Sequence, residues 1–152
     1  MDHQPHDKLE GPTWRLVEVT DGEWAGWSKW DPVDDFEVYV GPFYCRRDER
    51  GVVCGFMPET KNRNGGGNIH GGALMTFADY ALFIIAGGME ETMHGVTLSM
   101  NCDFIGAAEP GRLLTARGEV TRKGGTVVFV RGMIEDEGRA VLGFSGTIRR
   151  FR

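Results

Sequence analysis

Asp79 is a carboxylate inside the most apolar run of the chain. It lies within residues 71–88 (GGALMTFADYALFIIAGG), where nearly every other side chain is apolar. A helix that is apolar on all sides belongs in a protein interior, and burying a carboxylate there without a partner costs on the order of several kcal/mol. The position of Asp79 therefore suggests that this carboxylate has a chemical role.

A second chemical feature stands where the same run begins. His70-Gly71-Gly72 follows a glycine-rich loop that opens at Asn64. The free N–H groups at a helix N-terminus favour a phosphate or a developing oxyanion, and glycine lets a ligand come close to the backbone. No Gly-Lys-Ser/Thr follows, which excludes a P-loop, and there is no dinucleotide-binding fingerprint. A glycine-rich turn alone is more often structural than functional.

The distance between these two features predicts a site shared by two chains. Nine residues of α-helix rise about 13 Å, which is too far for His70 and Asp79 of one chain to share one small reacting group. If the helix pairs with its copy across a two-fold axis, Asp79 of one subunit can face the corner of the other. An acid in an apolar pocket opposite an oxyanion site suits attack on an acyl carbon by water or by the carboxylate itself. We therefore expect an obligate homodimer with two composite sites.

The hydrophobic pattern predicts an α+β fold with one long central helix and an antiparallel sheet. Strand-like patterns cover residues 36–45, where Gly41-Pro42 should bend or interrupt the strand, and residues 51–57. Four more strands are expected after the helix, at residues 96–105, 112–121, 126–135 and 139–150. Short turns favour antiparallel pairing of these four strands in a meander. An apolar helix needs a sheet curled around it, or a sheet on one side and a second subunit on the other.

The first 35 residues are predicted to form a tail and a Trp-rich segment ahead of the domain at residues 36–152. Trp24, Trp27 and Trp30 recur every third residue, which places them on one side of a helical or 3₁₀ turn. We expect them to pack against the body of the domain. The functional alternative is that one or more of them cover an apolar ligand pocket.

Charge and composition argue against several classes of protein. The formal net charge of −5 gives no basic stripe for nucleic acid, and the polar N-terminus carries no signal sequence, so a cytoplasmic location is expected. Asp79, Thr76 and four glycines argue against insertion of residues 71–88 into a membrane. Reduced thiols without metal-binding spacing are the interpretation for Cys45, Cys54 and Cys102. We expect no metal and no redox cofactor.

Together these residues resemble the hotdog-fold acyl-CoA thioesterases of the phenylacetate-degradation (PaaI-like) family. The likeness rests on Asn64, His70-Gly71-Gly72, Asp79 and the strand at residues 96–101, and it covers residues 36–150. The resemblance implies hydrolysis of acyl- or aryl-CoA thioesters to the free acid and coenzyme A, which enters as part of the substrate. It also implies a homodimer or a homotetramer.

The resemblance assigns a role to each residue of the motif. Gly71 would present its N–H to the thioester oxygen, His70 would hold that carbonyl or orient the thioester, and Asn64 would hydrogen-bond near the nucleophile or position water. Asp79 of the opposite subunit would be general base or nucleophile, and Thr97 would place the attacking water.

The nucleotide end of coenzyme A is less well defined by the motif. Arg122 and Lys123, next to the turn before residue 126, are candidates for binding its phosphates. A solvated hairpin turn is the more ordinary explanation for two basic residues at this place.

Two other functions fit parts of the pattern. A hotdog acyl-thioester hydratase or dehydratase needs an acid–base pair that brackets Cα and Cβ, and the motifs of those enzymes are absent from the sequence. A non-catalytic acyl-CoA binding module would gain little from an acid that faces the thioester. The missing motifs argue against the hydratase or dehydratase, and Asp79 argues against the binding module, so both remain as alternatives to the thioesterase.

Overall fold

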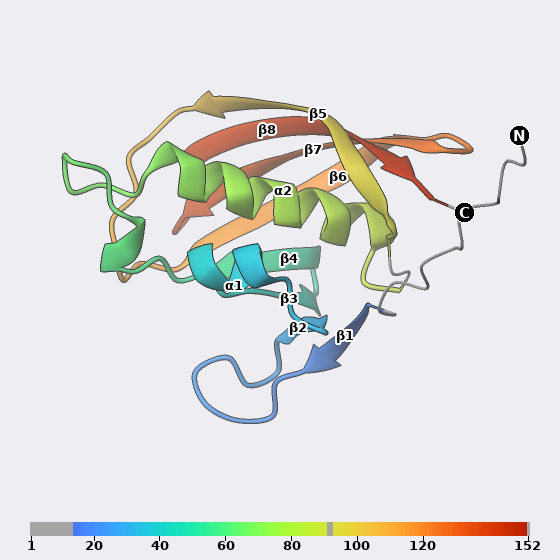
Figure 1. Cartoon of the computed structure of the whole chain (residues 1–152). Coiled ribbons are helices and arrows are strands. Elements are labelled where there is room, and N and C mark those ends of the chain that lie inside the picture. The colour runs from blue at the N-terminus through green and yellow to red at the C-terminus, as the bar shows by residue number, and fades with distance from the viewer. Residues whose placement is uncertain (1–13, 91–92, 152) are drawn as a thin grey trace, which may run out of the picture.

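The computed structural model describes residues 14–90 and 93–151. One antiparallel sheet curves along the long helix α2 (Gly71–Gly87), and a short helix α1 (Asp35–Val40) packs against α2 (Figure 1). The strands are β1 (Arg15–Glu18), β2 (Ser28–Asp31), β3 (Phe43–Asp48), β4 (Gly51–Phe56), β5 (Gly95–Phe104), β6 (Leu114–Lys123), β7 (Val127–Asp136) and β8 (Arg139–Arg150). Their order across the sheet is β1-β2-β3-β4-β6-β7-β8-β5. A 3₁₀ turn, Thr60–Asn62, lies between β4 and α2.

The long helix begins and ends at residues whose local chemistry suits those positions. His70 is its N-cap, and the Nδ1 atom accepts a hydrogen bond of 2.8 Å from the Gly72 N–H. Gly88 ends the helix with a positive φ of 63°, a conformation that glycine adopts without strain, and donates to the carbonyls of Ile84 and Ile85. The predicted helix is confirmed. None of the described helices is both long and apolar enough to cross a membrane.

The core lies between α2 and the concave face of the sheet. Phe43 stands at its centre, with ring centroids 4.9 Å from Phe56, 5.3 Å from Phe77 and 5.3 Å from Tyr80. Each such aromatic pair contributes about 0.5–1.5 kcal/mol beyond its buried area. The sheet completes the core with further buried side chains from three strands: Leu114 and Ala116 of β6, Val128, Val130 and Ile134 of β7, and Leu142, Phe144 and Ile148 of β8.

One side of α2 is left open by its own chain. Gly72 and Met75 are exposed, and Thr76, Asp79 and Phe83 are only half-buried. Because these residues recur every three or four positions, they share one side of the helix. Within one chain, therefore, the helix is apolar but is not covered on every side.

The meander is confirmed for β6, β7 and β8, but the position of β5 differs from the prediction. It does not pair with β6. Instead it lies at the edge of the sheet beside β8, with Met100 opposite Gly146, while β6 pairs with β4. The connection from β5 to β6 is too long for a tight turn, and the N–H groups of Ile105 and Gly106 both bond to the carbonyl of Val141. This connection lets the chain cross from one part of the sheet to another.

The strand predicted at residues 36–45 is wrong before residue 41, whereas the interruption at Gly41-Pro42 and the strand after it are confirmed. The chain forms α1 and then β3, separated by Gly41-Pro42. Asp34 starts α1, because its Oδ1 atom accepts a hydrogen bond of 2.9 Å from the Glu37 N–H. A side-chain cap has therefore outweighed the strand preference of the aromatic and β-branched residues in this segment.

The Trp-rich segment forms a β-hairpin rather than a helical or 3₁₀ turn. Strands β1 and β2 extend the sheet beyond β3, through the pair Ser28 and Cys45. Trp24 lies in the turn of the hairpin and stacks on Tyr44 with a centroid distance of 4.1 Å. Trp27 is buried against Gly55, where an added Cβ would lie 2.7 Å from the Trp27 ring. The tryptophans pack against the domain as expected. Residues 1–13 of the predicted tail lie outside the described residues.

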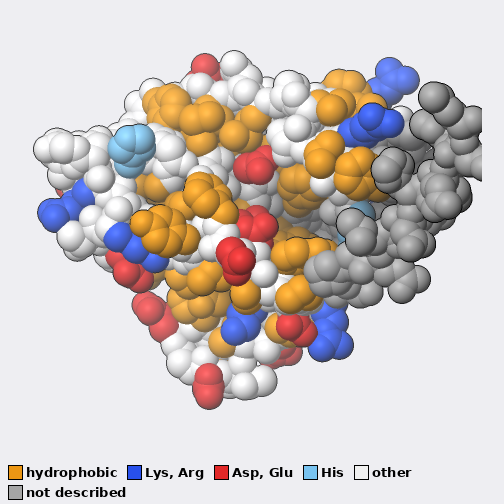
Figure 2. All heavy atoms as spheres, in the orientation of Figure 1, with side chains coloured by type: hydrophobic (Ala, Val, Ile, Leu, Met, Phe, Trp, Pro, Cys, Tyr) orange, Lys and Arg blue, Asp and Glu red, His pale blue; other side chains and the backbone are white. Residues whose placement is uncertain are grey.

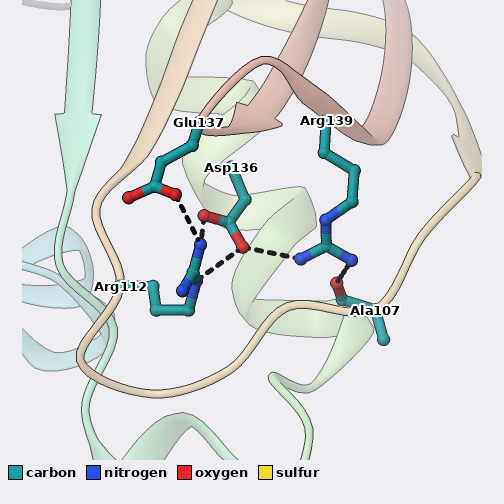
Figure 3. Close-up of polar contacts among 5 residues, drawn as sticks. All are labelled: Ala107, Arg112, Asp136, Glu137 and Arg139. Atoms are coloured by element: carbon teal, nitrogen blue, oxygen red, sulfur yellow. Dashed lines mark hydrogen bonds and ion pairs between the residues drawn. The ribbon is translucent and has the colours of Figure 1, made fainter.

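A buried carboxylate fixes the turn between β7 and β8 (Figure 3). The Asp136 carboxyl, 0% exposed, accepts hydrogen bonds from Arg112 Nε at 2.8 and 3.0 Å and from Arg139 at 2.6 Å. Arg139 also donates to the carbonyl of Ala107, and Arg112 to Glu137. The cluster therefore holds the turn against the connection between β5 and β6, which allows β5 to lie at the edge of the sheet.

We expect Asp136→Asn to lower the free energy of unfolding by about 1–3 kcal/mol, because it weakens charge-assisted bonds inside the protein. The Arg112 guanidinium holds the pKa of Asp136 below its ordinary value. Its contribution is thus present above the unfolded pKa of about 3.9 and is lost as the pH falls through the folded pKa. Urea unfolding at neutral and acid pH checks both effects.

The matched control is Glu137→Gln, because Glu137 also bonds Arg112 but is exposed to solvent. We expect it to change the free energy of unfolding by less than about 0.5 kcal/mol. Equal losses of unfolding free energy in the two variants would contradict a stabilising role for the buried carboxylate. So would an Asp136→Asn protein whose stability falls with acid pH as much as that of the unmodified protein.

Candidate active site

Asp79 stands midway along the open side of α2, with a hydroxyl fixed beside it. Thr97 Oγ1 donates to Asp79 Oδ1 at 2.6 Å, a distance in the range of charge-assisted O–H···O⁻ bonds. Thr97 belongs to β5, next to a break in register between Thr97 and Ser99. The bond occupies one carboxylate oxygen, so the second can accept a proton from a water molecule. The structure therefore brings together two of the predicted site residues.

Two hollows meet at this carboxylate. One, of about 450 Å³, has an apolar lining from Phe36, Met75 and Met100. The other, of about 310 Å³, includes Trp30 and Phe83 in its lining. Asp34, Glu37 and Asp79 line both hollows. Figure 2 shows acidic side chains in the middle of this face, with hydrophobic side chains around them.

The N-terminus of α2 offers two hydrogen-bond donors. Since His70 Nδ1 accepts from the Gly72 N–H, a neutral imidazole carries its proton on Nε2, and the side chain is exposed. The Gly71 N–H has no hydrogen-bond partner within residues 14–90 and 93–151. A Cβ at Gly71 would lie 2.8 Å from the Phe104 ring. Glycine thus permits a close approach at this point, as an oxyanion site requires.

Asn64 lies in the loop that leads to this corner. Its Oδ1 atom accepts a hydrogen bond of 2.9 Å from the Gly66 N–H, and its own N–H donates to the Asn68 carbonyl. The loop is joined to the helix start through the bond from the His70 N–H to the Asn62 carbonyl. With Oδ1 engaged in the turn, the side-chain NH₂ group of Asn64 is the part that can donate to a ligand.

The predicted site residues therefore form two separate groups in one chain. Asp79 and Thr97 make one group, and the corner with His70 and Gly71 makes the other, about 13 Å away along the helix axis. Arg122 lies at neither. It lies with Lys123 at the end of β6. The turn that follows bonds to the end of β8, because the Arg150 N–H donates to the Thr126 carbonyl, and the next residue, Phe151, donates to His94 in the segment after α2.

Sequence reasoning missed the contribution of α1, because that segment was expected to be a strand. Burial, followed by the neighbouring Asp34 and Asp79 charges, raises the pKa of Glu37 to about 8. The spacing of Asp34 and Glu37 was the available signal, since an acceptor followed three residues later by Glu is typical of a helix start. The buried Cys45 thiol is a poor nucleophile by contrast, because burial raises its pKa to about 11.

Comparison of the sequence with known proteins identifies the family of this chain. The model of the thioesterase superfamily matches residues 66–142. A Pseudomonas aeruginosa protein named as an esterase is 34% identical over 109 residues, which cover 70% of this chain and 81% of the relative. The chain belongs to the thioesterase superfamily. The predicted class of enzyme, a thioester hydrolase, is thereby confirmed.

Solved structures place this thioesterase among hotdog folds. The E. coli PaaI protein from the phenylacetic acid degradation operon superposes with a TM-score of 0.68 at 22% identity, over 78% of this chain and 86% of that chain. A hypothetical thioesterase protein from Streptococcus pneumoniae, solved with coenzyme A, gives a TM-score of 0.66 at 25% identity. The match covers 75% of this chain and 90% of that chain. The predicted fold and the resemblance to PaaI-like thioesterases are confirmed.

No group of three or more His, Cys, Asp or Glu side chains in the described part of this thioesterase is placed to hold a metal ion. The chemistry available at the two groups is that of a carboxylate, a hydroxyl, an imidazole and backbone amides. A base and an oxyanion site are the two parts that attack of water on a thioester carbonyl requires.

Proposed function

We propose that the protein hydrolyses acyl- or aryl-CoA thioesters to the free acid and coenzyme A, at sites that two subunits complete together. One observation carries this proposal. Asp79 lies on the open side of α2, and the N-terminus of the same helix forms the corner at Gly71, too far away for both to act on one carbonyl. Each is half of a hydrolytic site, and a second copy of the chain supplies the missing half.

The edge strand β5 supports a dimer of this kind. It pairs only with β8 in the described sheet, and it leaves Leu98 55% and Phe104 56% exposed. A long edge strand with exposed apolar side chains is a template for pairing with another chain. A two-fold axis near the middle of β5 would make the two sheets continuous and set the two α2 helices antiparallel. The homo-oligomer we propose is this dimer, or a tetramer made of two such dimers.

Hydrolysis at the composite site would proceed by attack of water on the thioester carbonyl. The Gly71 N–H and His70 Nε2–H bind the carbonyl oxygen and stabilise its negative charge in the tetrahedral intermediate. Asp79 of the partner subunit takes a proton from the attacking water, and Thr97 holds that carboxylate by the 2.6 Å bond. Asn64 donates from its side-chain amide to the water or to the thioester. The carbon–sulfur bond then breaks and releases the acid.

The same axis would also bring basic residues to the coenzyme A end of the substrate. In one chain Arg122 and Lys123 lie near the C-terminal end of α2. In an antiparallel pair of helices, that end stands beside the partner's helix N-terminus. Arg122 and Lys123 of one subunit would then meet the phosphates of a coenzyme A bound at the corner of the other.

Release of free thiol from a panel of short-chain, long-chain and aromatic acyl-CoAs tests this function. We expect rapid release from at least one class, and that class identifies the acyl group that the hollows accept. Tight binding of acyl-CoA by calorimetry without thiol release would support the binding module instead. Formation of a hydrated or dehydrated acyl-CoA with the thioester intact would support the hydratase or dehydratase.

A further inference from the structure

Glu37 is a second carboxyl group at the centre of the proposed active site. It lines both hollows that contain Asp79, and it comes from α1 rather than from the helix that carries the family motif. The hollow that it shares with Thr97 and Asp79 is about 450 Å³ in volume. A thioester whose carbonyl carbon lies within reach of Asp79 places its sulfur, one bond from that carbon, in the hollow that Glu37 also lines.

The short helix that carries Glu37 is fixed at both ends. Asp34 caps its start through the bond of 2.9 Å from the Glu37 N–H. At its end, the Gly41 N–H donates to the Glu37 carbonyl at 2.6 Å, and the buried Asn62 side chain donates to the Val40 carbonyl at 2.7 Å. These bonds hold the backbone of α1 against the body of the domain, so the Glu37 carboxyl is directed from a rigid support.

Acidic groups dominate the surroundings of Glu37. Burial, followed by the charges of Asp34 from its own helix and Asp79 from α2, raises the pKa of the carboxyl to about 8 and keeps it protonated near neutral pH. Lys29 from β2 lines a small cavity on another side, and His94, ahead of β5, lines the 310 Å³ hollow. Burial and, to a smaller extent, the charge of Glu37 raise the pKa of the nearby Tyr80 and Cys54.

We propose that Glu37 is the catalytic acid that works with Asp79, donating its carboxyl proton to the sulfur that leaves from the thioester. This role rests on the proposed thioesterase function. Asp79 takes one proton from the attacking water, whose oxygen forms the new bond to the acyl carbon. When the carbon–sulfur bond breaks, the Glu37 O–H bond breaks and an S–H bond forms. The proton held by Asp79 then passes to Glu37, which restores both groups.

The chemistry of the leaving group explains why a carboxyl group with a raised pKa suits this step. An ordinary Glu, with a pKa of about 4.3, is ionised at neutral pH and has no proton to give. Glu37 holds its proton up to about pH 8, which is close to the value of about 8.5 for an ordinary thiol. Two carboxyl groups with different environments divide the roles of acid and base, as in other hydrolytic enzymes.

The test is Glu37→Gln, assayed on two thioesters of the same acid. One is the coenzyme A thioester, and the other is the thioester of 4-nitrothiophenol, whose thiolate leaves without a proton. We expect kcat to fall about 10²-fold on the coenzyme A thioester, but only a few-fold on the aryl thioester. The unmodified enzyme should also lose kcat/KM on the coenzyme A thioester above about pH 8, and the variant should lack that decline.

The control is Asp35→Asn, which removes an exposed carboxylate from the first turn of the same helix. It should leave both rates and the pH profile unchanged, and the melting temperature of each variant reports on folding. Equal losses on both thioesters, or no loss at all, would overturn the assignment of Glu37 as an acid. If the unmodified protein releases no thiol from any thioester, the proposed function fails, and this role with it.

Discussion

Asp79→Asn is expected to lower kcat for acyl-CoA hydrolysis by about 10²–10⁴-fold, the contribution of a positioned general base. The substitution keeps the size of the side chain and an oxygen that can accept the Thr97 hydroxyl, now 2.6 Å from the carboxylate. It removes the lone pair and charge that take the proton from water. KM should change by only a few-fold, since Asp79 does not contact the coenzyme A end of the proposed substrate.

The same variant should be at least as stable as the unmodified protein. Asp79 lies near Glu37 and Asp34, and its charge is one of the causes of the raised pKa of Glu37. The substitution removes a half-buried negative charge from beside two other carboxyl groups, and Glu37 is itself protonated near neutral pH. Lost activity without lost stability is typical of a residue that is present for catalysis rather than for folding.

Rates of thiol release and melting temperatures of purified Asp79→Asn check both parts of this prediction. Asp35→Asn is again the control, because it removes an exposed carboxylate that lines neither hollow and lies outside the proposed dimer edge β5. A folded Asp79→Asn protein with unchanged kcat would exclude Asp79 as base and as nucleophile.

The helix and most of the sheet could be predicted because their signals are local. An apolar run between His70 and Gly88 predicted α2, and alternating patterns separated by glycine turns predicted β6, β7 and β8. The place of β5 could not be predicted in this way. It depends on which strand β5 meets after a long connection, and that is decided by pairing with distant residues such as Gly146.

The candidate site was partly predictable for a similar reason. Asn64, His70 and Gly71 form one continuous segment, so their spacing reveals the corner. Asp79 shares the same helix, and its distance from the corner follows from helical geometry. Glu37 was missed because its contribution requires α1 to be a helix and to pack on α2, and the apolar residues around it favoured a strand.

Two inactive variants are expected to restore activity when they are mixed, provided that each site is built by two subunits. His70→Asn removes the imidazole donor, while Asn remains a good N-cap for α2. We expect a loss of about 10²-fold, as for the removal of one oxyanion donor. Asp79→Asn removes the base instead. A mixed dimer then contains one site with both defects and one site with neither.

The size of the recovery follows from random pairing. In an equal mixture, half of the dimers are mixed, and half of their sites are intact, so about one quarter of all sites should be active. The mixture must be unfolded and refolded together so that subunits exchange. Each variant refolded alone is the matched control. Thiol release measured on species separated by sedimentation tests the oligomer, and we expect dissociated monomers to be inactive.

The most direct measurement is therefore thiol release from acyl-CoA by refolded His70→Asn, by refolded Asp79→Asn and by the two refolded together. A composite site predicts low rates for each variant alone and about one quarter of the unmodified rate for the mixture. If the mixture is no faster than the average of the two variants, each chain carries its own complete site. That result would contradict the proposal that Asp79 acts on a thioester held by the other subunit.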